Sequence, residues 1–335
     1  MKPALDKHPS GGVLSLGQLL EHHPAQTPAL IDPGLLPSSG ILFVGGEPKV
    51  GKSLLVANLA LALASGSSRT GFTIPQARRV LICQFELPTS QFAARLAPMR
   101  KPIGSAADSN LLIDTEAAGH LLSAPRGLDH FLRAVRAANA DVVVLDPLYS
   151  THDQDENDTR AMAALCQTLL RLRDVSHAAL IIVHHIRKSV GRYEIGSAFR
   201  GSSALHAVGD SYLLLVRPSP QVPTVELRFQ FRYAPAQEPR LLTLDADTLW
   251  FVPSHSATPS PQPRRKVETA DVERALAASG SVRFNQLRQQ IMDQSECSRR
   301  TAQLAIQRAC REGSIVHKNG QYCLPFTSSP RVAPR

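Results

Sequence analysis

The 335-residue sequence lacks the features of a membrane-spanning or secreted protein. Its longest apolar run, Leu54–Ala64, is interrupted by Asn58 and is too short to span a bilayer, which takes about 20 apolar residues. No charged segment followed by an apolar one opens the chain, so we expect no secretory signal. The five cysteines include no close pair and no metal-binding spacing. This pattern indicates reduced thiols, and we expect a cytoplasmic protein with no membrane partner.

The composition fits a folded chain with a basic end. A hydrophobic content of 43% supports a proper core, and the length allows one large α/β domain with a small appendage. The net charge is +9, and residues 264–335 hold 13 Lys and Arg against 6 Asp and Glu. A basic terminal segment predicts a polyanionic partner, most often nucleic acid, although ordinary solvated surfaces are also basic.

One segment has the sequence of a phosphate-binding loop. It follows the apolar run Ile41–Val44, precedes a helix-forming run, and reads Gly46-Glu47-Pro48-Lys49-Val50-Gly51-Lys52-Ser53. Glycines let successive backbone N–H groups and a helix N-terminus converge on one anion. We assign this loop and Leu54 to a nucleoside triphosphate, with Lys52 on the β- and γ-phosphates and Ser53 on Mg²⁺. The alternative is a glycine turn before a buried helix.

Short apolar runs alternate with helical runs over most of the chain. The predicted strands are Ile41–Val44, Arg79–Gln84, Asp141–Leu145 and Ala179–Val183. The predicted helices between and after them are 53–65, 89–99, 127–138 and 159–175. Continuous apolar strands separated by helices predict a doubly wound α/β sheet, mostly parallel with helices on both faces. Three later runs alternate in polarity, and we expect them to form antiparallel edge strands: 211–216, 224–233 and 239–244.

Composition divides the chain into five segments. Residues 1–38 are a lead-in with one short helix near 14–21, 39–252 form the α/β domain, 253–264 are a Pro/Ser linker and 327–335 a disordered tail. Residues 265–326 read as three helices, 267–278, 284–292 and 298–312, followed by a hairpin across Asn319-Gly320. This order is typical of a winged helix-turn-helix domain.

Polar residues follow three of the apolar strands and predict the chemistry of the triphosphate site. Asp146 ends the run Val142–Leu145 and would hold Mg²⁺ beside Ser53. Glu86 follows an earlier strand and could polarise the attacking water. His184 follows the fourth strand and could sense the γ-phosphate; we prefer it to His185 on position only. The alternatives are a turn aspartate, a solvent-exposed helix-start glutamate and a strand-capping histidine.

The segment after the fourth strand is basic and rich in glycine. It carries Arg187, Lys188, Arg192 and Arg200, which suits a groove that follows a single-stranded DNA backbone. The alternative is a surface loop without function. The acidic segment 151–158 has no assigned role.

Together these pieces resemble the RecA-type ATPases, and more closely the RepA-like hexameric replicative helicases of plasmids and mobile elements. The matching pieces are 46–53, Gln84-Phe85-Glu86, 142–146, Val183-His184-His185, and 200–203 with Asp210. The position of Glu86, away from the Asp146 strand, distinguishes that group from AAA+ proteins. The resemblance implies a RecA-like P-loop core, ATP with Mg²⁺, and a ring of six subunits.

The resemblance also implies an arginine finger donated by a neighbouring subunit. The segment Leu227–Tyr233 looks like the strand that carries it, with Arg232 as first choice and Arg228 as second. Either residue could instead be an ordinary edge-strand arginine.

The basic appendage departs from the plasmid helicase pattern. In a winged helix, the helix 298–312 would enter the major groove, where Arg299, Arg300 and Gln303, with Ser298 and Gln307, could reach phosphates or base edges. Docking to a protein is the alternative role for such a domain.

The sequence therefore leaves three functions open. The first is a DNA helicase or translocase for replication of a plasmid or mobile element. The second is a non-motor, site-specific DNA-binding ATPase that regulates replication, recombination or transcription. The third and weakest is a kinase.

Overall fold

The computed structural model describes residues 13–22, 29–186, 195, 199, 203–217, 223–254, 267–295, 297–318 and 320–325. The chain forms two compact units, Met1–Ser256 and Ala257–Arg335. Each unit has its own hydrophobic core. Among the helices in these ranges, none is long and apolar enough to cross a bilayer.

The first unit is built on a nine-stranded sheet with the order β3-β2-β4-β5-β1-β6-β7-β8-β9. Its strands are β1 Ile41–Gly46, β2 Val80–Gln84, β3 Leu111–Asp114, β4 Val142–Asp146, β5 Ala179–His185, β6 Ser211–Val216, β7 Thr224–Phe231, β8 Arg240–Leu244 and β9 Phe251–Pro253. The strands from β3 to β6 pair in parallel, and β6 to β9 pair antiparallel. The carboxyl ends of the parallel strands therefore meet at one edge.

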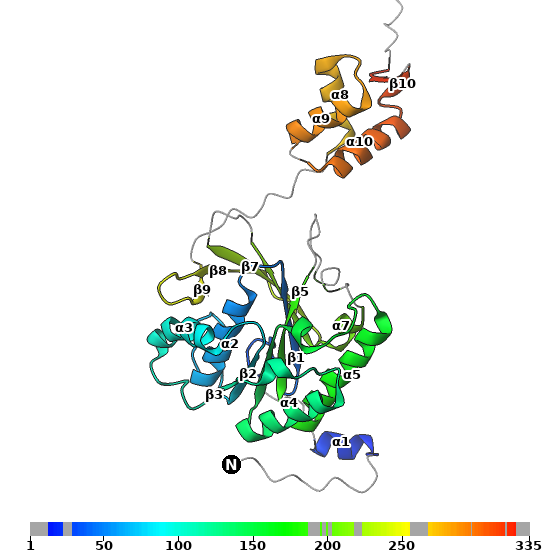
Figure 1. Cartoon of the computed structure of the whole chain (residues 1–335). Helices are drawn as coiled ribbons and strands as arrows, with labels where there is room; N and C mark the ends of the chain where they lie inside the picture. Colours follow the sequence, from blue (N-terminus) through cyan, green and yellow to red (C-terminus); the bar gives the residue numbers. More distant parts are fainter. Residues whose placement is uncertain are drawn as a thin grey trace, which may run out of the picture. The chain divides into compact units, whose positions relative to one another are not determined.

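Helices cover both faces of this sheet (Figure 1). The α-helices of the first unit are α1 Leu16–His22, α2 Lys52–Ser65, α3 Thr89–Arg100, α4 Pro125–Ala138, α5 Thr159–Ser176 and α7 Ser203–Val208. Short 3₁₀ turns lie at η1 Lys101–Ile103, η2 Ala117–Gly119 and η3 Leu148–Thr151. The α2 side of the sheet shares a core with α3, and the opposite side packs on α4, α5 and α7. Since strand side chains alternate, residues two apart on β1, β2, β4 or β5 share a face.

The central helix α2 is apolar around almost its whole circumference because it is buried on nearly every side. Asn58 lies in its middle and is fully buried. Its amide donates to the carbonyl oxygen of Leu249 (3.1 Å) and its side-chain oxygen accepts from the N–H of Phe251 (2.8 Å). The asparagine that interrupts the apolar run therefore joins α2 to β9.

The observed elements agree with most of the predicted ones, and the differences have physical reasons. Strand β3, Leu111–Asp114, was not predicted because it is a short strand at the edge of the sheet, with every residue half-buried. Strand β6 was expected as an antiparallel edge strand. It does pair antiparallel with β7, but it also pairs in parallel with β1 and so occupies an inner position. The expected alternation was wrong for this run, because Tyr212–Leu215 is a continuous buried stretch, as is typical of an inner strand.

The second unit contains three helices and a two-stranded hairpin. They are α8 Thr269–Ser279, α9 Phe284–Ser295, α10 Arg299–Arg311, β10 Val316–Lys318 and β11 Gln321–Cys323. A single bridge between Val282 and Tyr322 joins the hairpin to the segment before α9. The core of the second unit contains small and aliphatic side chains from all three helices, including Leu276, Leu287 and Ile306.

Candidate nucleotide-binding site

The loop between β1 and α2 has the backbone that the glycine motif predicts. Lys49 and Gly51 adopt positive φ angles of 64° and 108°. A Cβ on Gly51 would also lie 2.9 Å from the ring of Phe251, so this position excludes a side chain on two grounds. Gly51 precedes the first turn of α2 without any side-chain cap. The loop and the uncapped helix start therefore present backbone N–H groups of the kind that bind phosphate.

The Lys52 side chain is buried against this loop. Its ammonium donates hydrogen bonds to the carbonyl oxygens of Gly46 (2.8 Å) and Glu47 (3.0 Å). Burial lowers the pKa of Lys52 to about 8, while the nearby carboxylates of Asp146 and Glu86 act in the opposite direction. Lys52 is therefore a desolvated cation held in place between the loop and two acidic groups.

Ser53 and Asp146 meet at the carboxyl edge of the sheet. The Ser53 hydroxyl donates to Asp146 Oδ1 at 3.0 Å. Asp146 ends β4 and is 6% exposed, and burial raises its pKa to about 6 although the hydrogen bond from Ser53 lowers it. A hydroxyl and a carboxylate are hard oxygen ligands beside a phosphate loop, which fits the Mg²⁺ that accompanies nucleotides. The two residues predicted to hold the metal are thus brought together.

Glu86 follows β2, the strand next to β4. Gln84 Oε1 accepts hydrogen bonds from the backbone N–H groups of Glu86 (2.6 Å) and Leu87 (3.3 Å), which fixes this turn. The Tyr149 hydroxyl donates to Glu86 Oε1. The Glu86 carboxylate also influences the pKa values of Lys52 and Asp146, so all three predicted groups lie in one electrostatic neighbourhood.

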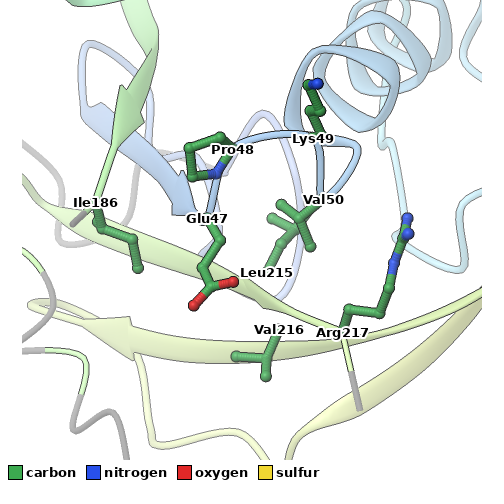
Figure 2. Close-up of a pocket in the computed structure, with 8 residues that line it drawn as sticks. All are labelled: Glu47, Pro48, Lys49, Val50, Ile186, Leu215, Val216 and Arg217. Atoms are coloured by element: carbon green, nitrogen blue, oxygen red, sulfur yellow. The ribbon is translucent and has the colours of Figure 1, made fainter. Parts of the chain in front are cut away.

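A pocket of about 330 Å³ adjoins the loop on the β6 side (Figure 2). Figure 2 shows its lining, with four residues from the loop, one after β5, two at the end of β6 and one directly after β6: Glu47, Pro48, Lys49, Val50, Ile186, Leu215, Val216 and Arg217. Arg217 is exposed where β6 ends. The pocket combines apolar walls with charged groups at its rim, as small-ligand sites do.

A protein-family model with the description "AAA domain" matches residues 9–191, which is more than half of the chain. The chain belongs to this AAA domain family. Its glutamate nonetheless follows β2 and not the Asp146 strand, as the resemblance implied. No curated protein matches the chain.

Three solved structures are similar to this chain. A DnaB-like replicative helicase, solved for its interactions with primase, gives a TM-score of 0.51 at 15% identity over 64% of this chain and 59% of that one. The ATPase domain of G40P gives 0.49 at 16% identity, covering 65% and 85%. The KaiC-like protein PH0186 from Pyrococcus horikoshii OT3 gives 0.45 at 13%, covering 67% and 94%. At 15% identity, the similarity to the DnaB-like helicase shows the fold alone. That fold agrees with the expected RecA-type ATPase fold.

The two histidines at the end of β5 lie on opposite faces of the sheet. His184 stacks on Phe199 at a centroid distance of 6.4 Å and is 5% exposed, within the core on the side of α4 and α5. Its pKa is lowered to about 4, mainly by burial. His185 lies on the α2 side, where Lys52 and Glu86 both affect its pKa. The charge of Lys52 lowers the pKa of both histidines, and the preference for His184 as the sensor stays a prediction.

The two arginines proposed as fingers have different environments. Arg232 lies beside the amino end of β1, where its guanidinium donates to the carbonyl oxygen of Ala207 (2.6 Å) and pairs with Asp210 (3.5 Å). Asp210 in turn accepts the N–H of Ile41, the first residue of β1 (2.9 Å). Arg228 forms an ion pair with Glu226, and both lie on β7. In the sheet, Arg228 is paired with Leu214 of β6, which is paired with Gly45 near the carboxyl end of β1. Arg232 therefore already has a structural role within its own chain.

Of the residues predicted to bind DNA, Arg187, Lys188, Arg192 and Arg200 lie outside the described part of the chain. Arg299, Arg300 and Gln303 are exposed on α10. Ser298 is the N-cap of this helix, and its hydroxyl accepts from the N–H of Thr301 at 3.2 Å. Its hydroxyl therefore caps the helix.

Sequence reasoning missed two residues of this neighbourhood and gave a third, Gln84, no role of its own. Tyr149 follows β4 and Arg217 follows β6. A position just beyond the end of an apolar strand was the sequence signal that could have identified them as site residues. Gln84 was noted only as part of a motif, and its hydrogen bonds to the following turn depend on a loop geometry that the sequence does not reveal.

Proposed function

We propose that the chain is an ATP-hydrolysing, DNA-binding ring ATPase, a helicase or translocase of the RepA-like type that serves replication of a plasmid or mobile element. The observation that carries this proposal is the convergence of Lys52, the Ser53–Asp146 pair and Glu86 at one edge of a parallel sheet. Phosphoryl transfer to water requires groups that bind the phosphates, hold Mg²⁺ and orient the attacking water, and these residues supply such groups around one phosphate loop.

Each residue of the site has a distinct task in hydrolysis. The loop N–H groups bind the phosphates, and Lys52 exchanges its two carbonyl partners for phosphate oxygens. Ser53 and Asp146 hold Mg²⁺, which supplies neutralising charge for the phosphates. Glu86 accepts a proton from the attacking water, so that the bond to the γ-phosphorus forms while the bond to the leaving ADP oxygen breaks.

Two further roles belong to this proposal. His185, on the α2 side, senses the γ-phosphate, in place of His184, which faces the opposite core. Arg232 or Arg228 donates the finger to a neighbouring subunit of a six-membered ring. The pocket that ends at Arg217 accommodates the base and ribose of the nucleotide.

The second unit gives the proposed duplex contact. Its order of three helices and a hairpin supports a winged helix-turn-helix domain, and Arg299, Arg300 and Gln303 occupy the exposed start of α10. The basic segment with Arg187 and Arg200 would follow single-stranded DNA.

A site-specific, non-motor ATPase is the second candidate because this basic unit could direct the protein to one duplex sequence. Two assays separate the candidates. A motor shows ATPase activity stimulated by single strands of any sequence and displaces a strand from a forked duplex. A regulator protects one duplex site and needs the residues after 263. Absence of strand displacement together with a discrete footprint would replace the motor by the regulator.

A further inference from the structure

Tyr149 lies where the ends of three neighbouring strands meet. It belongs to η3, the turn that follows β4 and Asp146. This turn is anchored on both sides of the tyrosine, because Leu148 and Thr151 are fully buried. The Thr151 hydroxyl donates to the Leu148 carbonyl oxygen at 2.7 Å, and the Thr151 carbonyl accepts from Leu122 N–H at 2.6 Å. The backbone of Tyr149 is thus held firmly while its side chain is 45% exposed.

The side chain of Tyr149 contacts groups from the strands on either side of β4. Its hydroxyl donates to Glu86 Oε1, beyond the end of β2. Its ring lies 5.3 Å from the ring of His185, at the end of β5, with an interplanar angle of 46°. In the sheet order, β4 lies between β2 and β5. Tyr149 therefore bridges the proposed general base and the proposed sensor.

Glu86 needs such a restraint. Its carboxylate is exposed and is carried on a side chain with several rotatable bonds, which loses conformational freedom when it is fixed. Gln84 fixes only the backbone of Glu86. Among the side-chain hydrogen bonds of the residues that the structure describes, the one that holds this carboxylate comes from Tyr149. It occupies Oε1 and leaves Oε2 to accept a proton.

We propose that Tyr149 is a positioning residue that holds the Glu86 carboxylate over the phosphate loop and joins it to the strand end carrying His185. The inference rests on the proposed hydrolytic function of the site. Tyr149 acts through Glu86 and takes no part in the proton transfer itself. Because the hydroxyl bonds to an ionised group, its loss reduces the fraction of Glu86 that is correctly placed.

The test is the Tyr149→Phe variant of the full-length chain, assayed for Mg·ATP hydrolysis. We expect kcat to fall about tenfold, which is in the range for a hydrogen bond to a charged group, with KM and ATP affinity unchanged. Tyr149→Leu, which also removes the ring, should lose at least as much. Tyr322→Phe is the matched control, since Tyr322 lies on β11 in the second unit and not in the unit that holds the nucleotide site.

A double-mutant cycle separates positioning from a general effect on structure. If Tyr149 acts only through Glu86, the Glu86→Gln variant should lose no further activity when Tyr149→Phe is added. An unchanged or raised kcat in Tyr149→Phe overturns the proposal, and so do losses that multiply in the double variant. Full activity of Glu86→Gln itself would contradict the proposed function instead, so the two failures are distinguishable.

Discussion

Replacing Asp146 by asparagine should make the first unit more stable while abolishing its chemistry. Asp146 is 6% exposed, and burial raises its pKa to about 6 from its ordinary value of 3.8. Asparagine has nearly the same shape and can still accept the hydrogen bond from Ser53 through its own Oδ1. The substitution therefore removes a buried charge with little change in packing.

The magnitude follows from the pKa shift. The folded state holds its proton at a higher pH than the unfolded chain, so stability is greatest below the unfolded pKa and falls as pH rises through about 6. The difference between 3.8 and about 6 corresponds to a loss of about 3 kcal/mol in the free energy of unfolding at pH values above 6. We expect Asp146→Asn to raise the free energy of unfolding by about 1–3 kcal/mol at pH 8, and by almost nothing at pH 4.

Trp250 makes the measurement specific to the first unit. It is the single tryptophan of the sequence, is fully buried, and donates its indole N–H to the carbonyl oxygen of Met99 at 2.7 Å. Urea titrations followed by tryptophan emission, without nucleotide, should therefore report unfolding of this unit alone. A variant no more stable than the natural chain at pH 8, or a gain that is equally large at pH 4, would refute the reasoning.

Three further substitutions test the remaining roles. Glu86→Gln should retain bound ATP without cleaving it, as measured by nucleotide retention against phosphate release, and normal turnover would require another base. Arg232→Ala should lose turnover. If the arginine acts in a neighbouring subunit, turnover should recover in rings mixed with Lys52→Ala subunits. A loss that persists in mixed rings would mean that Arg232 has only a structural role within its own chain. Replacing Arg299 and Arg300 together by alanine should weaken duplex DNA binding by about 1–3 kcal/mol at low salt and leave ATPase activity unchanged. Unaltered binding would exclude α10 as the element that contacts DNA.

The central fold could be predicted because buried parallel strands leave a direct mark on the sequence. The runs that became β1, β2, β4 and β5 are continuous and apolar, and each is followed by a polar residue or a glycine. Parallel pairing then requires those strand ends to meet at one edge, which placed Ser53, Glu86 and Asp146 near one another.

Other features depend on register and loop geometry that a single sequence does not specify. Which of His184 and His185 faces α2 depends on the strand register, and a shift of one residue reverses it. The contact between Tyr149 and Glu86 joins two separate turns, and the ties of Arg232 to Asp210 and Ala207 depend on the pairing of β6 with β7. No local sequence pattern predicts such contacts.

The most direct measurement of the central claim is the rate of phosphate release from Mg·ATP by the natural chain and by Lys52→Ala, each with and without single-stranded DNA. We predict turnover that single strands of any sequence accelerate in the natural chain, and none in the variant. Equal rates in the two proteins would contradict the assignment of the site.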